Sequence, residues 1–117
     1  MRSVNLFHIR LKYYLLRRAI FLMEYAQALG SAFRSLRLQL NLTQQDFLPT
    51  TSISTISRIE RGEMNPTLPV IEKLAKVMGI DPLVILVLAS ARRDGSEEGK
   101  AVIARIEEHL RMLGRIE

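Results

Sequence analysis

Apolar residues recur at helical spacing through the middle of the chain. Four of them, at positions i, i+4, i+7 and i+11, share one helix face: Leu29, Phe33, Leu36 and Leu40. The charged residues between them, Arg34 and Arg37, are expected to point away from that face. Asn41 is suited to end the helix, and Leu42, the next residue, is expected to pack into the core.

The next stretch predicts a second helix that begins after Thr43. Thr43 and Asp46 have the spacing of a capping box, in which each side chain bonds to the backbone N–H of the other residue. Phe47 and Leu48 are expected to form its buried side. Pro49 ends it, because proline lacks an N–H and disfavours helix in the preceding residue.

A third helix is predicted over residues 53–61, capped by Thr51 or Ser52 and ended by Gly62 in a left-handed conformation. Its isoleucines form a compact apolar stripe: Ile53, Ile56 and Ile59. The remaining face is polar and rich in hydroxyl groups: Ser54, Thr55, Ser57, Arg58 and Arg61.

Two further helices are expected before residue 91. The first is amphipathic, with Thr67 as its cap and Gly79 at its end, and Asp81-Pro82 is a strong start signal for the second. Residues 83–89 have no polar face, so something must cover them: the N-terminal extension, the C-terminal helix or a second copy of the chain.

Residues 92–96 are interpreted as a linker, and residues 97–113 as a last helix ended by Gly114. One face of that helix is apolar: Val102 or Ile103, Ile106, Leu110 and Leu113. Residues 1–28 form a basic, apolar extension whose longest uncharged run after Arg18 is too short for a signal peptide or a membrane span. Four interpretations stay open: a helix packed on the domain or a partner, a poorly ordered arm, a helix on a membrane surface, and a true start at Met23.

Composition narrows the class of protein. The apolar fraction of 48% favours a packed protein of one domain with extensions. The absence of cysteine excludes disulfides and thiol chemistry and fits a cytoplasmic location. His8 and His109 are far apart in sequence, so we expect no metal site. We find no nucleophile–base pair and no phosphate loop, and therefore expect no catalytic residue, no cofactor and no enzyme.

The net charge of +5 is unevenly distributed along the chain. Residues 1–29 carry +4, residues 30–91 carry +1, and residues 92–117 carry none of the net charge. Bulk basicity therefore belongs to the N-terminal extension and does not by itself predict DNA binding by the middle of the chain.

Four sequence strings together resemble the lambda-repressor/Cro-type helix-turn-helix regulators, the xenobiotic-response-element family. They are LTQ at 42–44, STISRIERG at 54–62, NPTL at 65–68 and LAKVMGI at 74–80. The resemblance covers about residues 29–90 and implies an all-α, five-helix DNA-binding domain over 29–91, with helical extensions at 1–28 and 92–117. One departure lies at the turn: residues 49–51 replace the end of the second helix and the glycine turn, and the spacing is two residues shorter than usual.

The resemblance also implies roles for individual residues. The expected base contacts are Ile53, Ser54, Ser57 and Arg58. The expected DNA-backbone contacts are Gln44, Thr43, Thr55, Arg61 and Asn65. Gln44 would also brace the third helix, and Glu60 is expected to be structural, through an arginine or a loop N–H. For Ile53 the apolar stripe predicts a core position instead, so both alternatives stay open.

We therefore predict a sequence-specific transcriptional regulator of double-stranded DNA, a repressor that acts as a homodimer on two half-sites. The expected dimer surface contains Leu83, Leu86, Val87, Ile106 and Leu110. One alternative is an antitoxin that holds a protein partner through residues 1–28 or 97–113. The other is a protein-interaction or membrane-peripheral adaptor, although a membrane is not the expected partner.

Overall fold

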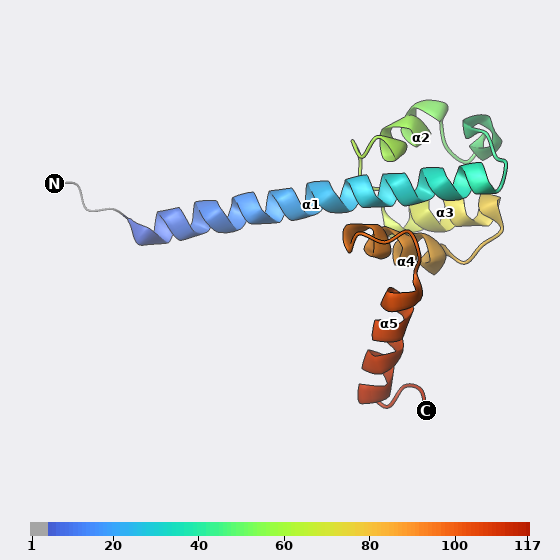
Figure 1. Ribbon diagram of the computed structural model, residues 1–117. Coiled ribbons are helices and arrows are strands. Elements are labelled where there is room, and N and C mark those ends of the chain that lie inside the picture. The colour runs from blue at the N-terminus through green and yellow to red at the C-terminus, as the bar shows by residue number, and fades with distance from the viewer. Residues whose placement is uncertain (1–4) are drawn as a thin grey trace.

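The computed structural model describes residues 5–117, without the side chains of residues 18–23, and the described chain is all-α (Figure 1). Its elements in chain order are α1 (Leu6–Gln39), the 3-10 helix η1 (Gln44–Phe47), α2 (Ile53–Glu60), α3 (Leu68–Met78), α4 (Pro82–Arg93) and α5 (Lys100–Met112). Helix α2 lies on one side of α1, while α3 and α4 lie on the other. Helix α5 projects away from α4, and the N-terminal part of α1 projects beyond the other helices.

Helix α1 is continuous over 34 residues. Its start is capped by Asn5, whose Oδ1 accepts hydrogen bonds from the backbone N–H groups of Phe7 and His8. Its end is set by Asn41, which has a φ of +58°, a left-handed conformation that asparagine tolerates. The boundary predicted between residues 28 and 29 falls inside this helix, so one rigid element joins the extension to the domain.

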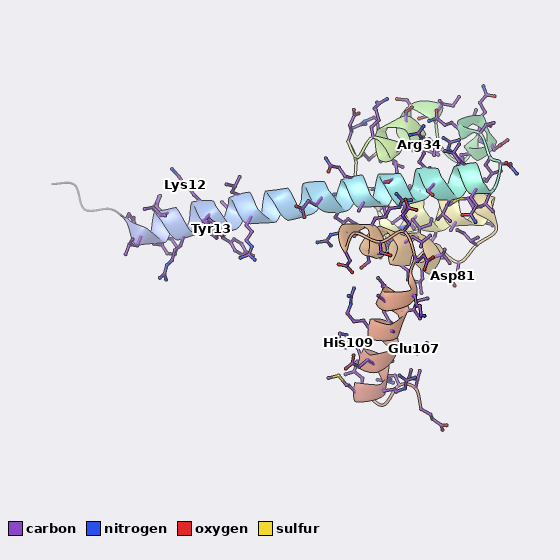
Figure 2. The ribbon with its side chains drawn as sticks, in the orientation of Figure 1. Lys12, Tyr13, Arg34, Asp81, Glu107 and His109 are labelled. Atoms are coloured by element: carbon purple, nitrogen blue, oxygen red, sulfur yellow. The ribbon has the colours of Figure 1, made fainter. Side chains whose placement is uncertain are left out.

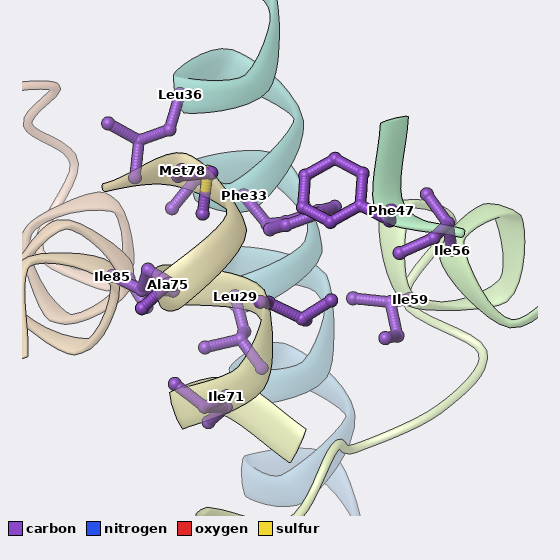
Figure 3. Close-up of a cluster of buried hydrophobic side chains, with 13 residues drawn as sticks. Leu29, Phe33, Leu36, Phe47, Ile56, Ile59, Ile71, Ala75, Met78 and Ile85 are labelled. Carbon is purple, nitrogen blue, oxygen red and sulfur yellow. The ribbon is translucent and has the colours of Figure 1, made fainter. Parts of the chain in front are cut away.

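The core lies where α1 meets the four following elements (Figure 3). Phe33 and Phe47 pack edge to face, with ring centroids 5.3 Å apart. Every element from α1 to α4 contributes buried apolar residues: Leu29, Ala32, Phe33, Leu36, Phe47, Ile56, Ile59, Ile71, Leu74, Ala75, Met78, Ile85 and Ala89. The predicted core face of α1 is confirmed at three positions, and Leu42 packs against the core as expected. Leu40 is exposed because α1 ends before it.

The predicted second helix is present only as the single 3-10 turn η1. The backbone N–H of Thr43 donates to Asp46 Oδ2 at 2.6 Å, as the capping spacing predicted. Phe47 is buried, but the prediction that Leu48 is buried is wrong: its side chain is half exposed. The chain leaves η1 at Leu48 in an extended conformation, and the Leu48–Pro49 peptide bond is cis.

The end of α3 and the start of α4 follow the sequence signals. Gly79 caps α3 with a φ of +70°, and Asp81 Oδ1 accepts a hydrogen bond from the backbone N–H of Leu83. The linker predicted at residues 92–96 begins too early, because α4 continues through Arg93. The last helix begins at Lys100 instead of residue 97. The residues between α4 and α5 form turns and bends, in which Gly95 has a φ of +83°.

Helix α4 is only partly covered. It packs most extensively against α1, and also against α3 and α5. Ile85 and Ala89 are buried, whereas the side chain of Leu83 is 62% exposed. The helix without a polar face therefore retains apolar surface in the monomer.

Within the described residues, we find no single helix with the length and apolar character to cross a membrane. Only α3 and α4 taken together meet those criteria, and they are joined at a 107° bend.

Candidate nucleic-acid interface

Helix α2 presents two chemically different faces. Ile56 and Ile59 are fully buried against α1 and the rest of the core. Because a helix turns by about 100° per residue, the face opposite these two isoleucines holds Ser54, Ser57, Arg58 and Arg61. The hydrophobic contact of two isoleucines therefore fixes which residues α2 offers to solvent.

Both ends of α2 are fixed by local hydrogen bonds. Ser52 Oγ accepts from the backbone N–H of Thr55 at 3.1 Å, which settles which residue caps the helix. At the other end Gly62 has a φ of +71°, and the N–H of Glu63 donates to the carbonyl of Arg58 at 2.9 Å. This is the left-handed glycine cap expected from the sequence.

Ile53 does not belong to the buried stripe of α2. Its side chain is 37% exposed and lies at the first position of the helix, next to the exposed Ser54. The sequence left two alternatives open for Ile53, and its exposure agrees with an accessible position and not with a core position. Ser54 and Arg58 are also exposed, and Ser57 is half-buried.

A buried polar network joins α1, η1 and α2. Arg37 Nε donates to Glu60 Oε1 at 2.7 Å, with side chains that are only 9% and 5% exposed. Arg37 Nη1 also donates to the carbonyl of Leu42 at 2.8 Å, and Gln44 Nε2 donates to Glu60 Oε2 at 2.6 Å. Glu60 therefore has partners on both carboxylate oxygens. Gln44 braces α2 as predicted, and Glu60 pairs with an arginine as predicted.

Arg37 was expected to point away from the apolar face of α1, and the structure places its side chain in a buried polar network and not in solvent. Its position off the apolar stripe was a valid reason to exclude it from the hydrophobic core. The structure buries it for a different reason, because Glu60 and the Leu42 carbonyl satisfy its charge and its donors. The only signal in the sequence was the need of Glu60 for an arginine partner, and spacing alone could not choose between Arg34 and Arg37.

A hollow of about 290 Å³ opens beside this network, at the junction of α1, η1 and α2. It is lined by Arg34, Arg37, Gln44, Ser57, Glu60 and Arg61. Arg34 is exposed on α1 (Figure 2). Gln44 Nε2 also lies 3.5 Å from Ser57 Oγ. Three guanidinium groups, a carboxylate, an amide and a hydroxyl therefore surround one open space, and the sequence had not predicted Arg34 as a site residue.

Arg61 lies at the end of α2 and pairs with Glu63. Its Nε and Nη2 donate to Glu63 Oε1 and Oε2, both at 3.0 Å, on the exposed surface. These hydrogen bonds lower the pKa of the Glu63 carboxyl and raise the pKa of the Arg61 guanidinium. A phosphate that contacts Arg61 would therefore compete with an exposed carboxylate.

The three other predicted backbone contacts have different surroundings. Thr43 and Asn65 are exposed at opposite ends of the η1–α2 segment. Thr55 is half-buried and lies 2.9 Å from Ser52 through its hydroxyl oxygen, so its hydroxyl is engaged at the start of α2. Thr55 and Ser57 are the two half-buried members of the predicted set on α2.

Close approach of α1 to the end of α2 depends on two glycines. A Cβ at Gly30 would collide with the carbonyl oxygen of Ile59, and a Cβ at Gly62 would lie 2.9 Å from Gln27 Cα. The sequence identified Gly62 as a cap but gave no role to Gly30. Its place inside a helix could have indicated this role, because a glycine there destabilises the helix by about 1 kcal/mol relative to alanine and is usually explained by close packing.

The predicted dimer residues gather around a groove between α4 and α5. The groove has a volume of about 270 Å³ and a largely apolar lining: Leu83, Leu86, Val87, Ser90, Val102, Arg105 and Ile106. Four of the five predicted residues thus lie together. Leu110 is half-buried one turn farther along α5.

Comparison with protein families gives one match, in which the Helix-turn-helix family model covers residues 33–85. These residues run from the core face of α1 to the start of α4 and include η1, the turn and α2. The match covers less than half of the 117 residues and is a similarity to a family of DNA-binding regulators. The all-α fold of the described residues agrees with the lambda-repressor-like architecture. Neither the curated proteins nor the solved structures give a match to the chain.

Proposed function

We propose that this protein is a sequence-specific transcriptional regulator that reads the DNA major groove with α2. The observation that carries the proposal is the exposed polar face of α2, held in place by the buried network of Arg37, Glu60 and Gln44. A helix that reads bases must be fixed relative to the groups that contact the phosphates. Here one network connects the reading helix to η1 and α1.

Four side chains on α2 would contact bases: Ile53, Ser54, Ser57 and Arg58. Ile53 and Ser54 lie in the first turn, the part of a recognition helix that approaches base edges. The exposed Ile53 suits the methyl group of thymine, and Arg58 can donate two hydrogen bonds to guanine O6 and N7. Ser54 and Ser57 can donate or accept, so they discriminate less between bases.

The DNA backbone would be contacted around α2. The hollow lined by Arg34, Gln44 and Arg61 offers donors to a phosphate. Thr43, Thr55 and Asn65 do not line it but lie along the same segment of the chain. Such contacts set the orientation of the protein on the duplex and carry no sequence information. Arg34 is an addition to the set predicted from sequence.

We further infer a homodimer that acts as a repressor. A single eight-residue helix reads few bases, whereas a two-fold dimer reads two half-sites about 34 Å apart. The exposed apolar groove between α4 and α5 supplies a surface for such pairing. Repression requires only occupancy of the operator, which a DNA-binding domain can provide. The cytoplasmic location stays a prediction of the sequence.

The decisive experiment selects bound sites from a random DNA library with the full-length chain, then measures the selected site by gel shift. Arg58→Ala and Ser54→Ala should weaken binding to the selected site, Arg58→Ala by about 1–3 kcal/mol, with a smaller loss on random DNA. Arg115→Ala, an exposed arginine after α5, is the matched control. Unchanged site preference in Arg58→Ala would refute the assignment of α2 as the reading helix.

A further inference from the structure

The N-terminal half of α1 is a rigid rod with its apolar side chains in solvent. Residues 6–23 continue the helix beyond the domain by about 27 Å, at 1.5 Å per residue. Figure 2 shows Lys12 and Tyr13 on this projecting part, away from the other helices. Eight large apolar side chains are 44–72% exposed: Leu6, Phe7, Ile9, Leu11, Tyr13, Tyr14, Leu15 and Leu16. A contiguous apolar surface of this kind marks an interaction site.

Four of these residues form a stripe with the spacing of a coiled-coil seam. Leu6, Ile9, Tyr13 and Leu16 are separated by three, four and three residues, the alternation of a and d positions in a heptad. The same spacing continues in the sequence at positions 20 and 23. This stripe, the α1 seam, would hold a helix along its length.

The flanks of the α1 seam are basic on both sides. In the heptad register Arg10 and Arg17 occupy e positions, and Lys12 occupies a g position. Residues 1–23 contain no aspartate and no glutamate. Charges at e and g positions select the partner of a coiled-coil helix, so the α1 seam favours a helix with carboxylates beside its apolar stripe.

Two other occupants fit less well. A second copy of the same arm would bring arginine and lysine against arginine and lysine, since both flanks carry the same sign. A membrane surface would cover one side of the rod and leave the other in water, because Phe7, Leu11, Tyr14 and Leu15 lie off the seam and are also exposed. Full insertion would bury Arg10, Lys12 and Arg17, each at a cost of about 2.5–3.5 kcal/mol or more at the bilayer centre.

We propose that the projecting half of α1 is the docking element for an acidic, helical partner protein, whose apolar stripes cover the rod and whose carboxylates pair with Arg10, Lys12 and Arg17. A helical partner can cover both faces of the rod, as in helix-in-groove recognition. Because α1 is continuous into the core, the partner would be held at a fixed position relative to α2. The proposal is independent of the base contacts assigned to α2.

The test uses the full-length chain and two labelled synthetic peptides, and it involves no DNA. Both peptides have about three heptads with leucine at a and d; one has glutamate at every e and g position, the other lysine. Fluorescence anisotropy should show that the glutamate peptide binds at least about tenfold more tightly than the lysine peptide. The triple variant Arg10→Glu/Lys12→Glu/Arg17→Glu should reverse this preference.

Two further variants distinguish charge pairing from nonspecific hydrophobic association. Lys73→Glu/Lys76→Glu/Arg115→Glu changes the net charge equally at exposed positions outside the arm and should retain the preference for the glutamate peptide. Ile9→Asp/Leu16→Asp should lose both peptides while circular dichroism and the unfolding transition of the domain stay unchanged.

Three outcomes would overturn the proposal. The first is equal binding of the two peptides, or a preference that the charge reversal leaves unaltered. The second is sedimentation showing that the wild-type chain self-associates and that Ile9→Asp/Leu16→Asp makes it monomeric. The third is binding to vesicles of anionic phosphatidylglycerol by the arm, without binding of the glutamate peptide.

Discussion

Arg37 and Glu60 show how one ion pair serves both stability and function. Each is almost fully removed from solvent, and each would be costly to bury alone. Glu60 uses one oxygen for Arg37 on α1 and the other for Gln44 on η1. The pair therefore sets the position of α2 relative to the two elements around it.

Removing the carboxylate should destabilise the fold more than removing both charges. Glu60→Ala leaves the Arg37 guanidinium buried without its partner, and we expect a loss of about 3–5 kcal/mol in the free energy of unfolding. Urea denaturation followed by circular dichroism measures it. Arg37→Met/Glu60→Met should cost less than Glu60→Ala alone, because no unpaired charge remains. The single variants Arg37→Met and Glu60→Met complete the comparison. If the double variant loses as much free energy of unfolding as the two single variants together, the two side chains are not directly coupled.

At the scale of elements, the packing of α1 on α2 depends on the absence of a side chain. Gly30 lies within α1, where glycine is intrinsically unfavourable. Its lack of a Cβ lets the α1 backbone approach the carbonyl of Ile59 at the end of α2. The free energy gained when α2 packs closely on α1 offsets the intrinsic cost of a glycine inside a helix.

Gly30→Ala should therefore destabilise the protein although alanine is the better helix former. Because the neighbouring atom is a backbone carbonyl that cannot rotate away, we expect a loss of about 1–3 kcal/mol. Ser35→Ala, at an exposed position of the same helix, is the control and should be neutral or slightly stabilising. Thermal unfolding of the two variants gives the comparison. A Gly30→Ala protein more stable than wild type would show that α1 and α2 can separate without cost.

At the scale of the whole molecule, two of the apolar surfaces exposed by the described residues lie on different elements. One is the α1 seam at the end of a projecting helix, and the other is the groove between α4 and α5. They differ in charge, because residues 1–29 carry +4 whereas residues 92–117 are neutral overall. A neutral surface suits pairing with an identical copy, and a strongly basic one suits a partner of opposite charge.

The groove between α4 and α5 should control the oligomeric state. Leu83→Glu/Ile106→Glu places two like charges on exposed positions of the proposed dimer surface, and the fold should tolerate them because both side chains are largely solvent-exposed. Sedimentation should show a dimer for wild type and a monomer for the variant. The monomer should bind a two-half-site operator about a hundredfold more weakly or worse, since the second contact is no longer linked to the first. A wild-type monomer at micromolar concentration would refute the dimer.

Local sequence signals were sufficient to predict the helices from α2 to α5 and most of their ends, but not the helix over the N-terminal extension or the reduction of the second helix to one 3-10 turn. Glycines at 62 and 79 and the Asp81-Pro82 start signal act locally, because they depend on the conformations that a few neighbouring residues can adopt. Hydrophobic periodicity likewise identified Ile56 and Ile59 as core residues and the opposite face of α2 as the accessible one. The family strings then assigned that face to DNA.

Packing between elements explains the residues that depart from that pattern. Arg37 is buried because Glu60, distant in sequence, comes within hydrogen-bonding distance. Ile53, at the first position of α2, is 37% exposed although it continues the isoleucine stripe. Gly30 matters only because another helix approaches it. Periodicity describes one helix at a time, whereas burial depends on what the neighbouring elements place against each face.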